Sequence, residues 1–121
     1  MKRLIKPIFT SISLDDIPEA NKGGNCFKVA VDTLMSNPNG FLVHGVVTGQ
    51  GAIDGVQYCH AWVEIGDMVI DNTVPIIIDK HVYYAIGNIQ ITRRYSYKEA
   101  LEQMLQTETY GPWDRAFDNY L

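Results

Sequence analysis

Cysteine is scarce in this sequence, and the scarcity limits the chemistry that we expect. The two cysteines, Cys26 and Cys59, lack the CxxC spacing of zinc and redox motifs and are too few for a disulfide framework. A single disulfide between them stays open, because disulfide geometry needs coordinates. Both residues suit a reducing compartment.

Long apolar runs are also missing. No stretch approaches the roughly 18 apolar residues of a membrane span. The first residues, MKRLIKPIFTSISL, begin like a signal peptide, but Pro7 and several hydroxyl residues interrupt the apolar run, and no small-residue cleavage site follows. The sequence therefore predicts a cytoplasmic protein without a membrane partner.

Positive charge is the third shortage. The sequence has ten Lys and Arg and fourteen Asp and Glu, which gives a formal net charge of −4. This charge balance does not favour binding to nucleic acid. The remaining composition is that of a globular protein, with 46% hydrophobic and 20% charged residues. A chain of 121 residues fits one domain over 1–121, and no motif indicates its oligomeric state.

Apolar spacing and turn residues predict the elements of the first half. Residues 1–20 suggest a short strand or extended arm. Asn25 is a good N-cap for a helix over 26–35, in which apolar residues recur at i, i+3, i+4 and i+7. Strands are expected over 41–48, 57–65 and 68–73, the last two joined by the two-residue turn Gly66-Asp67.

The second half is predicted to be mostly helical. Asp79 could cap a short helix through residue 86, and a strand over 89–95 follows. Ser96 and Glu99 form a capping box before an amphipathic helix, and a last short helix is expected over 113–120. One helix, then strands, then helices indicate an α+β fold with helices packed on an antiparallel sheet.

The Gly66-Asp67 turn fixes a strand register that brings a histidine and a carboxylate close together. It places Trp62 opposite Asp71, so Asp71 becomes a diagonal neighbour of His60 on the same face. Diagonal pairs are about 7 Å apart, close enough for a carboxylate to reach an imidazole and fix its tautomer. The face as a whole should carry His60, Trp62, Glu64, Val69, Asp71 and Thr73.

Cys26 is the expected nucleophile for this histidine. Cys59 is adjacent to His60 along a strand and must point to the opposite face. Cys26 begins a helix, where unpaired N–H groups and the helix dipole favour a thiolate. Its own backbone N–H could stabilise an oxyanion, with Asn21 or Asn25 as candidates for a second donor.

These residues resemble a known pattern. GGNCFKVAVDTL is similar to the nucleophile helix of papain-like and transglutaminase-like enzymes, and HAWVEIGDMVIDNT resembles their His strand followed by their Asp strand. The nearest likeness is to the transglutaminase core and to the peptidases that process lasso-peptide leaders, and small proteins of bacterial viruses also look similar. Position 20 is Ala where papain relatives place an oxyanion glutamine, so the strict papain pattern is not met.

The resemblance implies a papain-like or transglutaminase-like domain with Cys26 as nucleophile, His60 as base and Asp71 as the third member of a triad. It implies a cysteine peptidase or amidase that hydrolyses a peptide or other acyl substrate through an acyl-enzyme, with no metal or organic cofactor. Alternatives are a transglutaminase-type acyltransferase, a catalytically silent binding module of the same fold, and a zinc site built from the same three residues.

Several other residues have simpler interpretations. Trp62 is expected to pack beside the site, and Glu64 to be a solvated strand residue rather than an acid catalyst. His44 and His81 are expected to be structural or exposed. The aromatic turn over 110–113 could form a lid over a cleft, but a tail that packs an apolar patch is the favoured interpretation.

Overall fold

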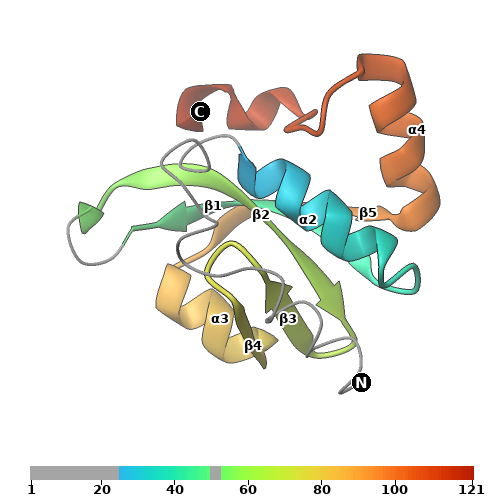
Figure 1. Cartoon of the computed structure of the whole chain (residues 1–121). Helices are drawn as coiled ribbons and strands as arrows, with labels where there is room; N and C mark the ends of the chain where they lie inside the picture. Colours follow the sequence, from blue (N-terminus) through green and yellow to red (C-terminus); the bar gives the residue numbers. More distant parts are fainter. Residues whose placement is uncertain (1–24, 50–52) are drawn as a thin grey trace.

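The computed structural model describes residues 25–49 and 53–121. Within them, five strands form one antiparallel sheet in the order β4-β3-β2-β1-β5, and helices lie on both of its faces (Figure 1). The predicted α+β class is confirmed. The arm expected over 1–20 and Asn21 lie outside the described residues.

The elements are α2 (Asn25–Met35), β1 (Phe41–Thr48), β2 (Gln57–Ile65), β3 (Met68–Asp71), β4 (Ile76–Asp79), α3 (Lys80–Gly87), β5 (Gln90–Ser96), α4 (Tyr97–Thr107) and the 3-10 helix η4 (Arg115–Tyr120). Every element predicted within the described residues is present. Strand β4 was not predicted, because Pro75 and the short apolar run after it gave no alternating pattern.

Local signals in the sequence set the boundaries of several elements. The Asp79 side chain accepts hydrogen bonds from the backbone N–H groups of His81 and Val82, which satisfies two donors at the start of α3. The predicted capping box of Ser96 and Glu99 begins α4. Gly66 has a φ of 57° in the hairpin turn, a left-handed conformation that glycine adopts without strain.

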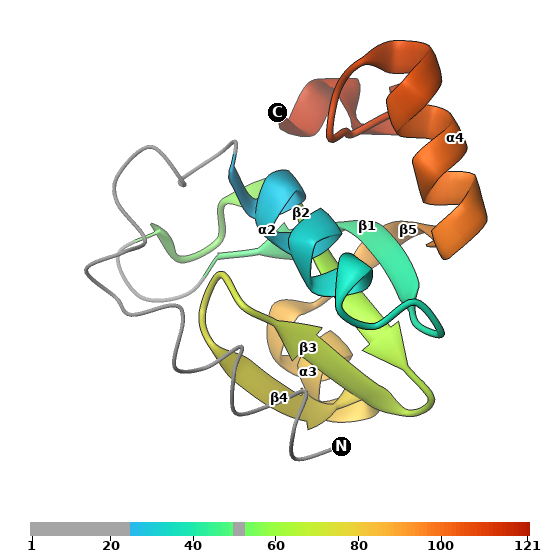
Figure 2. The ribbon, with the colours of Figure 1, turned by 45° about the vertical axis from the view of Figure 1, so that its right-hand side comes forward.

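Two apolar cores lie on opposite faces of the sheet. Figure 2 shows α2 across β1 and β2, with α3 on the far side of β3 and β4. Side chains alternate along β2, so Ala61 and Val63 pack with Leu34 toward α2, whereas Trp62 packs with Val69 toward α3. Residues of α4 and η4 complete the first core. Because both faces are covered, the centre of the sheet is buried on each side.

The β2–β3 pairing is shorter than predicted. The ladder contains Ile65–Met68, Glu64–Val69 and Val63–Ile70 and stops there, so the expected pairs of Trp62 with Asp71 and His60 with Thr73 are not formed. The chain turns after Asp71 over residues 72–75 and begins β4. Among the described strands, none neighbours the first half of β2 on the β3 side, and this is where the candidate site lies.

The C-terminal aromatic turn belongs to the first core. The Trp113 ring contacts Tyr95 and His44, and its indole N–H donates to the Thr109 carbonyl oxygen. The interpretation as a tail that packs an apolar patch is confirmed, and residues 110–113 do not line the cavity described below. No helix in the described ranges is long and apolar enough to cross a membrane.

Candidate active site

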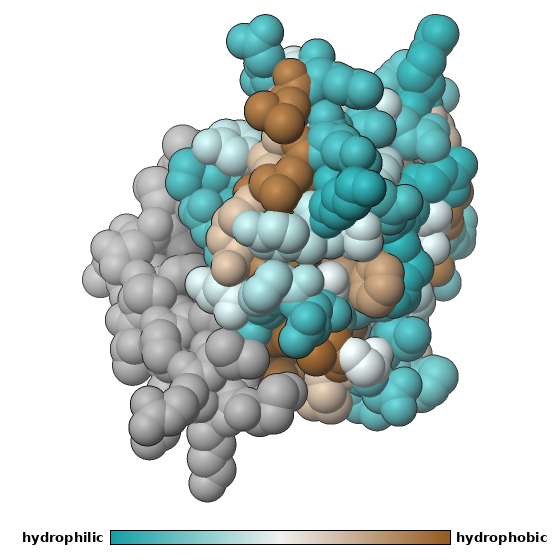
Figure 3. Space-filling view, turned by 90° about the vertical axis from the view of Figure 1, so that its right-hand side faces the viewer, coloured by the Kyte–Doolittle hydropathy of each residue, from teal (hydrophilic) through white to brown (hydrophobic). Residues whose placement is uncertain are grey.

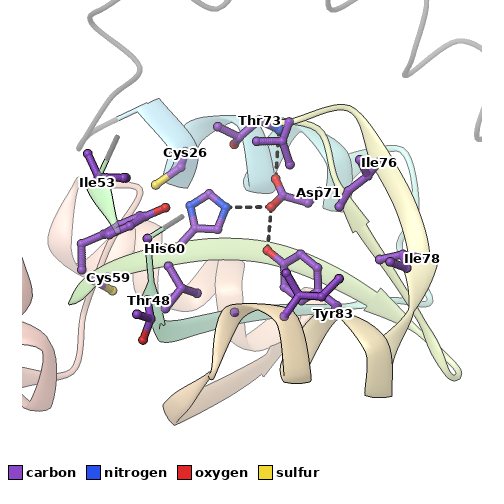
Figure 4. Close-up of a pocket in the computed structure, with 16 residues that line it drawn as sticks. Cys26, Thr48, Ile53, Cys59, His60, Asp71, Thr73, Ile76, Ile78 and Tyr83 are labelled. Atoms are coloured by element: carbon purple, nitrogen blue, oxygen red, sulfur yellow. Dashed lines mark hydrogen bonds and ion pairs between the residues drawn. The ribbon is translucent and has the colours of Figure 1, made fainter. Parts of the chain in front are cut away.

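Cys26 lies in the first turn of α2 and is buried. The first four N–H groups of a helix have no intrahelical acceptor, and the Cys26 N–H is one of them; the helix dipole at this end favours negative charge on a nearby group. Figure 4 shows this sulfur on one side of the His60 ring, with Asp71 on the other side. Asn25, the guessed second donor, is the first residue of the same helix.

His60 and Asp71 make the contact that the sequence predicted. His60 Nε2 and Asp71 Oδ2 are 2.7 Å apart, and both side chains are buried. The ring nitrogen that does not contact Asp71 is the one on the side of Cys26 (Figure 4). The three predicted residues therefore lie in the order cysteine, histidine, aspartate, with the imidazole in the middle.

Asp71 is held by two further hydrogen bonds that sequence reasoning did not find. The Tyr83 hydroxyl of α3 donates to Oδ2 at 2.6 Å, and the Thr73 backbone N–H donates to Oδ1 at 3.0 Å. Both carboxylate oxygens are thus occupied, and the carboxylate has a fixed orientation. Tyr83 carries no sequence signal for this role, because only the packing of α3 on this face of the sheet places it there.

The turn after Asp71 is also tied to the nucleophile helix. The Asn72 side-chain amide donates to the Thr33 hydroxyl at 2.7 Å, and both residues are buried. Thr33 lies on α2, two turns beyond Cys26. This bond connects the helix that carries the sulfur with the segment that carries the carboxylate.

The surroundings of His60 favour the protonated form of its imidazole. Burial alone would lower the pKa of His60, but the charge and hydrogen bond of Asp71, together with Cys26, raise the pKa well above its ordinary value. Burial would raise the pKa of Asp71, yet His60, Tyr83 and the Thr73 N–H lower it below the usual value. A charged histidine beside Cys26 stabilises a thiolate.

The second cysteine has a different environment. Burial, with a smaller contribution from Cys26, raises the pKa of Cys59 to about 12, so its thiol stays protonated. Both cysteines are free, so they form no disulfide. In the part of the chain that the structure describes, no group of three or more His, Cys, Asp or Glu side chains is placed to hold a metal ion.

A cavity of about 620 Å³ opens beside the three residues. Cys26, His60 and Asp71 all form part of its wall. The volume is in the range of sites that bind small molecules or side chains, which is about 300 to 1,000 Å³. The cavity lies where the pairing of β2 with β3 has ended, next to the half of β2 that pairs with β1 alone among the described strands.

Glu64 corrects one expectation. It is fully buried rather than solvated, and its carboxylate accepts hydrogen bonds from Trp62 Nε1 and the Tyr84 hydroxyl. Arg94 of β5 forms an ion pair with it, and Lys80 Nζ lies 3.9 Å away. An alternating strand pattern cannot distinguish a solvated carboxylate from a buried one whose partners come from other elements.

The remaining predicted residues lie outside the site. Trp62 is fully buried, as expected for a packing residue. His81 is exposed at the start of α3. His44 is buried among the rings of Phe27, Tyr95 and Trp113, and neither of its ring nitrogens has a hydrogen-bond partner among the residues that the structure describes. Burial lowers the pKa of His44 to about 3, so the ring is neutral.

Comparisons of the chain with protein-family models, with curated proteins and with solved structures found no match.

Proposed function

We propose that this chain is a thiol hydrolase, a cysteine peptidase or amidase with a papain-like or transglutaminase-like arrangement of Cys26, His60 and Asp71. The observation that carries the proposal is the buried His60–Asp71 hydrogen bond of 2.7 Å, with the Cys26 sulfur on the opposite side of the same imidazole. All three residues open onto one cavity. A buried histidine paired with a carboxylate beside a helix-start thiol is the geometry of an activated nucleophile.

The reaction follows from these positions. The His60 nitrogen that faces the sulfur takes the Cys26 proton, and the thiolate forms a bond to the carbonyl carbon of an amide or related acyl group. The resulting oxyanion accepts a hydrogen bond from the Cys26 N–H. When the C–N bond breaks, the imidazolium donates its proton to the leaving amine, and a thioester to Cys26 is left.

Water completes the cycle. His60 takes a proton from a water molecule, whose oxygen attacks the thioester carbonyl carbon, and the departing Cys26 sulfur recovers a proton from the imidazolium. The products are a carboxylic acid and the free thiol. An amine in place of water would give the transglutaminase-type transfer, and the same triad would serve both reactions.

The first test is the pH dependence of iodoacetamide alkylation at Cys26, followed by peptide mass spectrometry. We expect rapid alkylation at pH 6 in the native protein, and a loss of at least about 10²-fold in His60→Ala. Cys59 in the same molecule and the exposed-site variant His81→Ala serve as matched controls. Far-ultraviolet circular dichroism shows whether each variant is folded. Asp71→Asn is a second substitution that disrupts the His60–Asp71 pair.

Equal alkylation rates at Cys26 in the folded native protein and the folded His60→Ala variant would remove the thiol-hydrolase proposal. A silent binding module of the same fold would then become the better interpretation, because binding does not need an activated sulfur. Purified protein that holds stoichiometric metal would instead favour the zinc site.

A further inference from the structure

Apolar side chains dominate the wall of the cavity beside Cys26. They come from four separate parts of the chain: the end of β1, the segment before β2, the segment from the β3–β4 turn through β4, and α3. The aliphatic residues among them are Val47, Ile53, Val74, Ile76, Ile78 and Ile86. Figure 4 shows Ile76 and Ile78 of β4 on the side of the cavity beyond Asp71.

Charged side chains that could bind an ionic group of a substrate are scarce among the described residues of the same wall. Among the described residues that line the cavity there is no Lys, Arg or Glu, and the only Asp and His are Asp71 and His60, which pair with each other. Both oxygens of Asp71 already accept hydrogen bonds. An ammonium or carboxylate group of a substrate would lose its hydration here without gaining a counter-charge, which is strongly unfavourable.

The apolar surface extends to the mouth of the cavity. Three of the lining residues remain substantially exposed, namely Ile53 at 49%, Val74 at 52% and Ile86 at 57%. The side of the molecule that carries α4 looks different, because hydrophobic residues form only small groups there on a mostly hydrophilic surface (Figure 3). Apolar residues exposed around one concave site are typical of a binding surface.

From these observations we propose that the cavity binds an uncharged aliphatic group attached to the carbonyl carbon that Cys26 attacks. The substrate class is an amide or ester of an aliphatic acyl group, whether that group is a linear acyl chain or the branched side chain of an apolar residue. This inference rests on the proposed thiol-hydrolase function. Each methylene that leaves water in such a cavity strengthens binding about fourfold.

The experiment compares acylation of Cys26 by 4-nitrophenyl esters of different acyl groups. The esters are acetate, hexanoate, the branched 4-methylpentanoate and the negatively charged adipate monoester, and each rate is divided by the rate with free cysteine. Intact-mass spectrometry follows acyl transfer to the protein, and Cys26→Ser provides the background. We expect the hexanoate or the branched ester to react on the order of 10²-fold faster than acetate, with adipate no faster than acetate.

A variant pair sharpens the test. Ile86→Arg places a positive charge in the wall of the cavity, and we expect the adipate-to-hexanoate ratio to rise at least about tenfold. Leu105→Arg makes the same substitution on α4, at a residue that is 81% exposed and does not line the cavity, and should leave all ratios unchanged.

The outcomes separate the two proposals. Faster reaction of the linear ester would indicate acyl-chain substrates, and faster reaction of the branched ester would indicate peptides with an aliphatic residue before the scissile bond; either result supports the inference. Equal normalised rates for acetate, hexanoate and adipate, in a protein whose Cys26 alkylation by iodoacetamide still depends on His60, would overturn the inference alone. Loss of that His60 dependence would overturn the proposed function instead.

Discussion

Two buried carboxylates lie on the same face of the β2–β3 ribbon, and their surroundings differ in a way that separates chemistry from structure. Asp71 and Glu64 are both almost completely buried, and consecutive tyrosines of α3 donate a hydrogen bond to each of them, Tyr83 to Asp71 and Tyr84 to Glu64. The cationic partners differ, because Asp71 contacts a histidine at 2.7 Å whereas Glu64 pairs with Arg94.

The chemical role of a buried carboxylate depends on its cationic partner and on whether a cavity lies beside it. Arginine stays charged at any ordinary pH, and Arg94 forms an ion pair with the Glu64 carboxylate, which also accepts a hydrogen bond from the indole N–H of Trp62. Histidine can gain and lose a proton, and the Asp71 pair borders a cavity that contains a thiol. If the proposed thiol chemistry holds, the Asp71 pair belongs to the reactive region, and the Glu64 network serves the stability of the fold.

Removing the charge of each carboxylate in turn should have the largest effect. Asp71→Asn should lower the rate of Cys26 acylation by about 10⁴-fold, because an amide no longer stabilises the imidazolium or fixes its tautomer. Glu64→Gln should leave that rate within about threefold. Single-turnover acylation by a 4-nitrophenyl ester measures both, and a similar loss in the two variants would show that the assignment of roles is wrong.

The two buried histidines provide the next test. His44 contacts no carboxylate within the described part of the chain. Burial lowers its pKa to about 3, below the ordinary 6.5, so the unfolded chain takes up the proton first as the pH falls. The free energy of unfolding should then decrease by about 1.4 kcal/mol for each pH unit below 6.5. In His44→Leu the His44 contribution to this dependence should be absent, which amounts to roughly 2 kcal/mol between pH 6.5 and 4.5 in urea titrations.

His60 should behave in the opposite sense. Its pKa is raised in the folded protein, so its pairing stabilises the fold fully below pH 6.5 and the stabilisation is lost as the pH rises through the folded value. His60→Leu should therefore lose stability relative to the native protein mainly in acid, where His44→Leu gains. If the free energy of unfolding changed with pH in the same way in both variants, the environments described for His60 and His44 would be wrong.

Glu64→Gln should have its main effect on stability. The carboxylate receives charge-assisted hydrogen bonds from inside the protein, and weakening them should reduce the free energy of unfolding by about 2 kcal/mol at neutral pH. Urea unfolding followed by tryptophan fluorescence measures the change. Lys28→Gln, which removes an exposed pair with Asp32, should cost less than about 0.5 kcal/mol and is the matched surface control.

Much of the fold could be predicted because its signals are local. The spacing of Phe27, Ala30 and Leu34 defines α2, the Gly66-Asp67 turn fixes the register of β2 and β3, and the caps at Asp79 and Ser96 begin two helices. The His60–Asp71 contact follows from that register and did not need the whole ladder to form. Strand β4 gave no such signal, since its position depends on pairing with β3 across the turn.

The parts of the site that could not be predicted depend on contacts between distant segments. Tyr83 reaches Asp71 only because α3 packs on that face, and Asn72 reaches Thr33 only because the turn over 72–75 leaves the sheet. The sequence wrongly predicts a solvated Glu64 for the same reason, because its partner Arg94 lies 30 residues further along the chain. Sequence periodicity assigns a residue to a face, but it does not reveal what covers that face.

The consecutive tyrosines of α3 give the finest test of the comparison, because the same substitution can be made beside each carboxylate. Burial raises the pKa of Asp71, while His60 and Tyr83 lower it, so Tyr83→Phe should let that pKa rise. We expect the acylation rate to fall about tenfold and its acid limb to move to higher pH, because Asp71 becomes protonated sooner. Tyr84→Phe should instead cost about 1 kcal/mol of stability and leave the pH–rate profile unchanged. If both variants shift the acid limb equally, the two carboxylates would form one coupled network, and the division of the sheet into a reactive and a structural region would have to be abandoned.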